Sequence, residues 1–121
     1  MSKYDITELW DERIGADVPE KYDLAGLLMK RSAIGNPNSK YEPTIDHVRP
    51  LSDGGKDVSG NIEIVNRKTN AEKADNYTYW SANGQKFKVV KTKFVPYGYH
   101  SIKADTPKNQ KKKEKRNANK N

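Results

Sequence analysis

The feature that most constrains the fold is a block that reads strand, loop, strand and helix. Residues 44–48 (TIDHV) and 61–66 (NIEIVN) are short runs rich in β-branched side chains, which predict two strands. The loop between them, residues 49–60, is polar. Asn66 is a good N-cap residue, and the sequence RKTNAEKAD that follows it predicts a helix. The block therefore predicts a small α+β core at about residues 40–76.

Little apolar material is available to enlarge this core. Only 33% of the 121 residues are hydrophobic and the mean hydropathy is −1.08, so we expect a single domain, residues 1–106. The absence of cysteine excludes disulfides, thiolate zinc sites, iron–sulfur clusters and cysteine nucleophiles. No run of 18 apolar residues predicts a membrane span, and the first residues lack the layout of a secretory signal. We therefore expect a cytoplasmic protein that does not bind membranes.

The positive charge is concentrated at the end of the chain. Residues 107–121 contain seven Lys or Arg and one Glu, so they contribute +6 of the net charge of +7. We expect this tail to be disordered, because it has almost no apolar side chains. It is either a DNA-binding arm or a solubilising extension, and the release of counterions from DNA favours the arm. The basic residues proposed to contact DNA there are Lys111, Lys112, Lys113, Lys115 and Arg116.

Two helices are predicted before the core. Ile6, Leu9 and Trp10 have helical spacing after Asp5, which can cap a short helix. A second helix is expected over residues 22–34, because leucines form an i, i+3, i+4 stripe there. Asp23 would cap this second helix and Gly35 would follow its C-terminus.

After the core, the sequence predicts one strand over residues 86–95, where lysines alternate with apolar side chains. These lysines either form the wet face of an edge strand or face phosphates. Trp80 and its tyrosine neighbours are expected to pack in the core, with stacking on bases as the alternative. His100 is expected to be an ordinary loop residue.

Polar side chains in the core block have spacings that suit phosphodiester hydrolysis. Asp46 and His47 end the first strand, and Asn61 and Asn70 follow His47 by 14 and 23 residues. A histidine can act as general base near neutral pH. A carboxylate and an amide oxygen are appropriate ligands for Mg²⁺ or Mn²⁺. Neighbours on a regular strand point to opposite faces, so we expect the strand to end or bulge at Asp46 and His47.

Basic side chains near this cluster can hold phosphate oxygens. The candidates are Arg49, Arg67 and Lys73, and Lys73 lies one helical turn beyond Asn70. An ordinary exposed helical lysine is the alternative interpretation of Lys73.

The block IDHVRPLSDGGKDVSGNIEIVNRKTNAEKAD resembles the HNH (His-Asn-His) endonucleases, in the variant whose last motif residue is Asn. Upstream, SAIGNPNSKYEPTIDH is similar to the approach segment of small phage-type HNH proteins. The resemblance implies that His47 is the general base and that Asp46 and Asn70 bind the metal. It also implies that Asn61 braces the loop 49–60 by hydrogen bonds to its backbone.

The resemblance implies a ββα-metal (His-Me finger) fold with an N-terminal helix and a β extension. It further implies a metal-dependent DNA endonuclease that uses one Mg²⁺ or Mn²⁺ and leaves 5′-phosphate and 3′-hydroxyl ends. Many relatives hold a structural zinc with two Cys-x-x-Cys pairs, which this chain lacks, so we expect no zinc. The alternative function is a catalytically silent DNA-binding module with the same fold. Partners in phage packaging or in a mobile element, and the oligomeric state, stay open.

Overall fold

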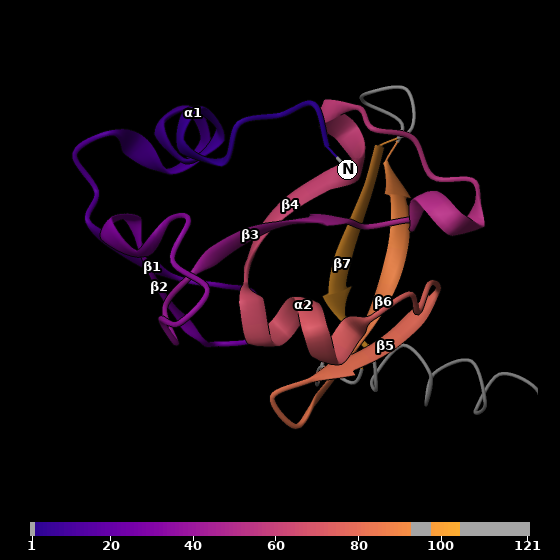
Figure 1. Ribbon diagram of the computed structural model, residues 1–121. Helices are drawn as coiled ribbons and strands as arrows, with labels where there is room; N and C mark the ends of the chain where they lie inside the picture. The colour runs from indigo at the N-terminus through magenta and orange to yellow at the C-terminus, as the bar shows by residue number, and fades with distance from the viewer. Residues whose placement is uncertain (1, 93–97, 105–121) are drawn as a thin grey trace, which may run out of the picture.

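The computed structural model describes residues 2–92 and 98–104 (Figure 1). The chain forms a small mixed α+β fold of short helices and antiparallel sheets. The proposed basic tail, 107–121, and the end of the strand predicted over 86–95 lie outside the described residues.

The predicted strand–loop–strand–helix unit is present. Strand β3 (Pro43–His47) pairs antiparallel with β4 (Ile62–Asn66), and α2 (Arg67–Lys73) follows directly. Asn66 caps α2 as predicted, because its side-chain oxygen accepts a hydrogen bond from the Lys68 N–H. In Figure 1, α2 lies between this hairpin and a three-stranded sheet.

The short N-terminal helix is also confirmed. Helix α1 (Ile6–Trp10) begins after Asp5, whose carboxylate accepts hydrogen bonds from the first turn. One turn of π-helix (Asp11–Gly15) continues it. Leu9 and Trp10 are buried, so this segment packs its apolar side chains against the hairpin β3–β4.

The helix predicted over residues 22–34 is wrong. Strand β1 (Glu20–Tyr22) and β2 (Leu28–Lys30) form a hairpin there, followed by a 3₁₀ turn (Arg31–Ala33). Gly26 has a φ of +84° at the bend, a conformation incompatible with a helix.

Asp23 is buried at the same bend, where we expected a helix cap. One of its carboxylate oxygens accepts N–H bonds from Ala25 and Leu27, which shapes the turn. The other oxygen accepts bonds from Asn66 N–H and the Thr69 hydroxyl of α2. Asp23 therefore ties the hairpin β1–β2 to the core, a tertiary role that overrides the leucine stripe.

The C-terminal part is a sheet in the order β5–β6–β7. These strands are Tyr79–Ala82, Gln85–Thr92 and Gly98–Lys103. Strand β6 confirms the described part of the predicted strand, whereas β5 and β7 were not predicted. Asn83 and Gly84 both have positive φ in the β5–β6 turn, and this Asn-Gly pair is a hairpin signal that could have revealed β5. His100 lies in β7, so its placement in a loop was wrong.

Trp80 packs in the core, as expected. Its ring stacks on Phe87 with centroids 4.4 Å apart, and both side chains are buried with Ala25 and Ala82. Tyr79, by contrast, is 66% exposed. No helix in the described part of the chain is long and apolar enough to cross a membrane.

Candidate active site

Asn61 holds the loop between β3 and β4, and its side chain is fully buried. Its oxygen accepts a hydrogen bond from Arg49 N–H, and its amide group donates to the carbonyls of Arg49 and Lys56, each at 2.9 Å. These are the side chain-to-backbone bonds that the resemblance implied. The loop is thereby fixed immediately after His47, and it contains two 3₁₀ turns, Leu51–Asp53 and Ser59–Asn61.

The loop also needs glycine at a close backbone approach. A Cβ atom added to Gly55 would lie 1.8 Å from the Arg49 carbonyl oxygen, so no other residue fits without a shift of the backbone. Gly54 has a φ of +83°, which also favours glycine. The Gly-Gly pair therefore lets the chain turn tightly after Pro50.

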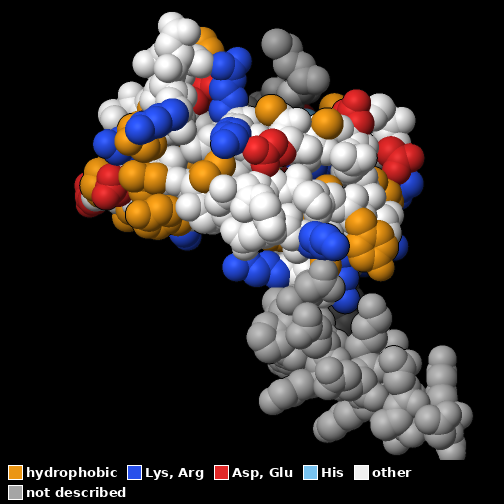
Figure 2. Space-filling view, turned by 90° about the horizontal axis from the view of Figure 1, so that it is seen from below, with side chains coloured by type: hydrophobic (Ala, Val, Ile, Leu, Met, Phe, Trp, Pro, Cys, Tyr) orange, Lys and Arg blue, Asp and Glu red, His pale blue; other side chains and the backbone are white. Residues whose placement is uncertain are grey.

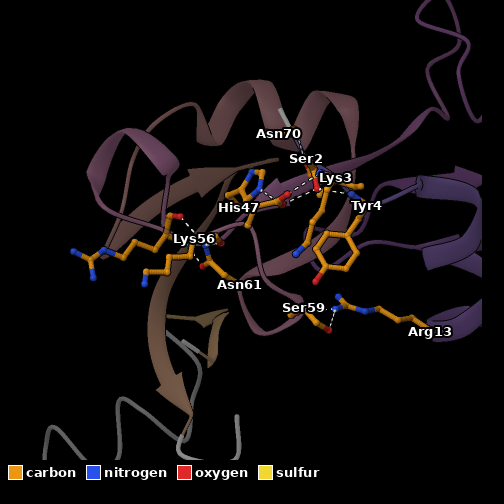
Figure 3. Close-up of polar contacts among 12 residues, drawn as sticks. Ser2, Lys3, Tyr4, Arg13, His47, Lys56, Ser59, Asn61 and Asn70 are labelled. Carbon is orange, nitrogen blue, oxygen red and sulfur yellow. Dashed lines mark hydrogen bonds and ion pairs between the residues drawn. The ribbon is translucent and has the colours of Figure 1, made fainter. Parts of the chain in front are cut away.

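His47 contacts a carboxylate that the sequence did not indicate. Its Nε2 lies 2.9 Å from Asp57 Oδ1, and Asp57 also accepts bonds from the Ser2 hydroxyl and Lys3 N–H. Figure 3 shows His47, Ser2 and Lys3 gathered at this point. Partial burial acts to raise the pKa of Asp57, but these hydrogen bonds outweigh it and lower the pKa to about 2.

Asp57 lies two residues after the Gly-Gly pair, and Ser2 and Lys3, which bond to it, belong to the N-terminal segment. Nothing in the sequence pattern links Ser2 to Asp57, because the two are 55 residues apart. Only the packing of the N-terminal segment against the loop brings them together.

Asp46 and His47 leave β3 on opposite faces. Strand pairing is regular up to the last residue, with Asp46 opposite Glu63 and His47 opposite Ile62, so there is no bulge. Of the two alternatives expected here, the strand ends, since β3 stops at His47, and there is no bulge because the ladder stays intact up to that residue. Burial, the largest effect, raises the pKa of Asp46, whereas His47 acts to lower it.

Asp46 is buried next to Lys73. The Lys73 ammonium lies 3.2 Å from Asp46 Oδ1, and the second oxygen, Oδ2, is buried with no hydrogen bond from the described residues. Burial raises the pKa of Asp46, although the Lys73 ammonium acts in the opposite direction.

Lys73 is not available to a phosphate, which corrects its assignment as a DNA-binding residue. Its side chain is 1% exposed, and its ammonium also donates to the His47 carbonyl at 3.2 Å. A charged group in such a place must be paired, and here its partner is Asp46. Both the phosphate-binding and the exposed-lysine interpretations are therefore replaced by an internal ion pair.

Asn70 lies against the same strand. Its amide group donates to the Thr44 hydroxyl at 3.0 Å and to the Ile45 carbonyl at 3.2 Å. Asn70 and Lys73 thus donate hydrogen bonds to the carbonyls of Ile45 and His47. These two carbonyls lie on the edge of β3 that does not pair with β4. The Asn70 oxygen accepts no hydrogen bond from the described residues, so it is free to bind a cation.

Glu63 is a second carboxyl group that the sequence did not indicate. It lies opposite Asp46, and Ser101 N–H of β7 donates to it at 3.2 Å. Burial is the main cause that raises its pKa to about 7, and the nearby Asp46 adds to this effect. The sheet β5–β6–β7 covers the face of β4 that carries Glu63, because Ser101 of β7 bonds to it.

The residues proposed to bind Mg²⁺ offer two oxygen donors. Within the described residues, no three His, Cys, Asp or Glu side chains are close enough to form a metal site. Asp46 Oδ2 and the Asn70 oxygen are unpaired hard donors, and Mg²⁺ typically keeps several waters beside one or two protein ligands. The donor chemistry of these two residues therefore suits the cation, which would share the buried Asp46 carboxylate with Lys73.

Both arginines proposed to bind DNA are held by the protein. Arg49 donates to the Asp53 carbonyl at 2.9 Å and to the Tyr99 hydroxyl at 3.3 Å. Arg67 is paired with Glu42 at 3.3 Å, but its side chain is 54% exposed. Their contacts with DNA stay predictions, and the proposed lysines and arginine of the tail lie outside the described residues.

Comparisons with protein-family models, with curated proteins and with solved structures gave no match to this chain.

Proposed function

We propose that this protein is a metal-dependent endonuclease of the HNH type that hydrolyses DNA phosphodiester bonds. The observation that carries the proposal is the placement of Asn70 against β3, hydrogen-bonded to Thr44 and Ile45, immediately before Asp46 and His47. Asn70, the last motif residue, thus packs against the strand that carries Asp46 and His47, although they are 24 and 23 positions away in sequence, and this supports the proposal. The resemblance of the motif supplies the reaction class.

His47 is the proposed general base. Because Asp57 has a pKa of about 2, it is ionised at neutral pH and can only accept hydrogen bonds. His47 Nε2 must therefore donate the proton in this contact, which leaves Nδ1 of the neutral imidazole as the basic nitrogen. Asp57 thus orients the ring and sets its tautomer, and Nδ1 takes the proton of the attacking water.

Asp46 and Asn70 are the proposed ligands of Mg²⁺ or Mn²⁺. The cation, when bound, would stabilise charge on the scissile phosphate and the departing oxygen. Asn61 and Gly55 keep the loop after His47 in one conformation, so the base is held in a defined position. Cleavage in this way leaves 5′-phosphate and 3′-hydroxyl ends.

Plasmid nicking tests the proposal. The wild-type protein should nick supercoiled DNA with Mg²⁺ and not with EDTA. His47→Ala should lower the rate at least about 10²-fold, the usual contribution of a positioned general base, while DNA binding persists. His100→Ala is the matched control, because His100 is the other histidine and is exposed on β7. Equal rates for both variants would refute the role of His47.

A catalytically silent DNA-binding module is the second candidate. The observation in its favour is the ion pair of Asp46 with Lys73, which occupies one oxygen of a proposed metal ligand. This candidate predicts that the wild-type protein binds DNA without nicking it at any Mg²⁺ or Mn²⁺ concentration.

A further inference from the structure

A groove of about 660 Å³ lies between the hairpin β1–β2, the segment before β3 and helix α2. Its apolar lining includes Leu27, Leu28 and Tyr41. Its basic lining consists of Lys40, Arg67 and Lys68. Figure 2 shows Lys and Arg side chains next to hydrophobic ones on the side of the molecule that carries this hairpin.

The segments that form the walls of the groove are connected by hydrogen bonds from one buried side chain. The buried Asn66 donates from its amide group to the carbonyls of Leu28 and Lys40, each at 2.9 Å. It thus connects the hairpin, the segment before β3 and the start of α2. The groove is therefore a preformed surface, which lowers the entropic cost of binding.

The described charged side chains that line the groove are all basic, although Arg67 is paired with Glu42 and Lys68 with Glu72 beside it. No acidic residue is among the described residues that line it, and Lys68 and Lys40 are exposed. Lys30 adds a further cation, since its ammonium lies 4.4 Å from the centre of the Tyr41 ring. Apolar walls with cations at the rim suit a ligand that alternates apolar sugars with phosphates.

The groove and the candidate active site share two elements. Tyr41 comes two residues before β3, and His47 ends that strand, so about 20 Å of extended chain separates them. Lys68 lies in the first turn of α2. Further along this helix, Asn70 contacts Thr44 and Ile45 of β3, and Lys73 contacts His47 at the end of the strand. Over this separation, only a polymeric ligand is long enough to contact both the groove and His47, which excludes a small phosphate ligand from bridging them.

We propose that this groove binds one strand of DNA outside the cleavage site, with Lys40 and Lys68 on phosphates and sugars against Leu27, Leu28 and Tyr41. The assignment of DNA as the ligand rests on the proposed function, in which DNA is the substrate. The groove contact itself is independent of catalysis and is measurable without metal.

The test is a binding titration of the full chain with a labelled 20-base-pair duplex in EDTA. The double variant Lys40→Gln/Lys68→Gln should bind about tenfold or more weakly near 0.1 M salt. The slope of log K against log salt should become shallower by about 1.8, since two phosphate contacts are lost. The matched control, Lys21→Gln/Lys103→Gln, removes the same charge from exposed positions outside the groove. Equal losses in the two double variants would overturn the proposal.

Both variants should fold, because the lysines are exposed and the Lys68–Glu72 pair, at 3.9 Å, is a surface pair of little energy. A polyglutamate peptide of matched charge is the second probe. If it bound as tightly as DNA and with the same dependence on Lys40 and Lys68, the groove would be a peptide site and the DNA assignment would be wrong. If the wild-type protein binds DNA through the groove but does not nick it, the proposed function is refuted and the groove proposal stands.

Discussion

Lys73 and Asp46 form a buried ion pair that neither residue's sequence context reveals. Taking two charges out of water is costly, and the pair offsets this cost only while both partners are present. Removal of one partner is therefore far more damaging than removal of an exposed charge.

We expect Lys73→Met to lower the free energy of unfolding by about 3–5 kcal/mol, because Asp46 would stay buried without its partner. Urea unfolding measures this value. Lys68→Met, on the same helix with a side chain 66% exposed, should change it by less than about 1 kcal/mol. The double variant Asp46→Ala/Lys73→Met should lose less than the sum of the single variants. Strict additivity would argue against the pair.

Glu63 makes stability depend on pH. Its pKa is about 7 in the folded state against an ordinary value of 4.5, so folding favours its protonated form. The stability from this proton is complete below about pH 4.5 and is lost as pH rises through 7. The free energy of unfolding of the wild type should fall across this window relative to Glu63→Gln, by on the order of 3 kcal/mol at most. Parallel pH profiles in chemical denaturation would contradict the burial of Glu63.

At the level of elements, the loop between β3 and β4 is the most constrained connection. The buried Asn61 side chain donates hydrogen bonds to the loop carbonyls of Arg49 and Lys56, and the Arg49 carbonyl lies directly against Gly55. A short hairpin turn would not place His47 and Asp57 in contact, whereas this longer loop folds back to do so.

Gly55→Ala tests this constraint. The added methyl group would meet the Arg49 carbonyl, so the loop must shift, and we expect a loss of at least about 2 kcal/mol in the free energy of unfolding. Gly35→Ala is the control, because Gly35 has a φ of +78° but open space around it. Its cost should be limited to backbone strain of about 1 kcal/mol. Similar melting temperatures for the two variants would show that the close approach is not decisive.

At the scale of the whole molecule, the described fold brings the N-terminal segment, the hairpin β1–β2 and the C-terminal sheet around one ββα unit (Figure 1). The net positive charge, by contrast, is concentrated outside the described residues, since residues 107–121 contribute +6 of the +7. Under the proposed function, residues 107–121 are thus expected to add affinity for DNA without taking part in the chemistry of cleavage.

A chain of residues 1–106 should therefore bind any duplex more weakly. If three to five of the basic residues beyond Pro107 contact phosphates, the slope of log K against log salt should become shallower by about three to four. Cleavage at saturating DNA and low salt should change little, since His47 and Asn70 are retained. Binding isotherms of both chains at several salt concentrations measure the slopes, and parallel slopes would identify a solubilising extension.

The sequence by itself determined the ββα unit. Strands β3 and β4 and the Asn66 cap were predicted because each depends on neighbours within one short block. Local propensity, capping and turn chemistry act over such distances, and they agree with one another here. The bracing bonds of Asn61 were implied by the resemblance of the motif and not by local propensity.

Only the tertiary structure decided the rest. Residues 22–34 became a hairpin because Asp23 bonds to α2, and Glu63 became buried because a later sheet covers its face. Likewise, His47 contacts Asp57, and Asp57 accepts a hydrogen bond from Ser2 of the N-terminal segment. Burial and charge pairing depend on what packs against a residue, and a periodic pattern along the chain carries no information about that partner.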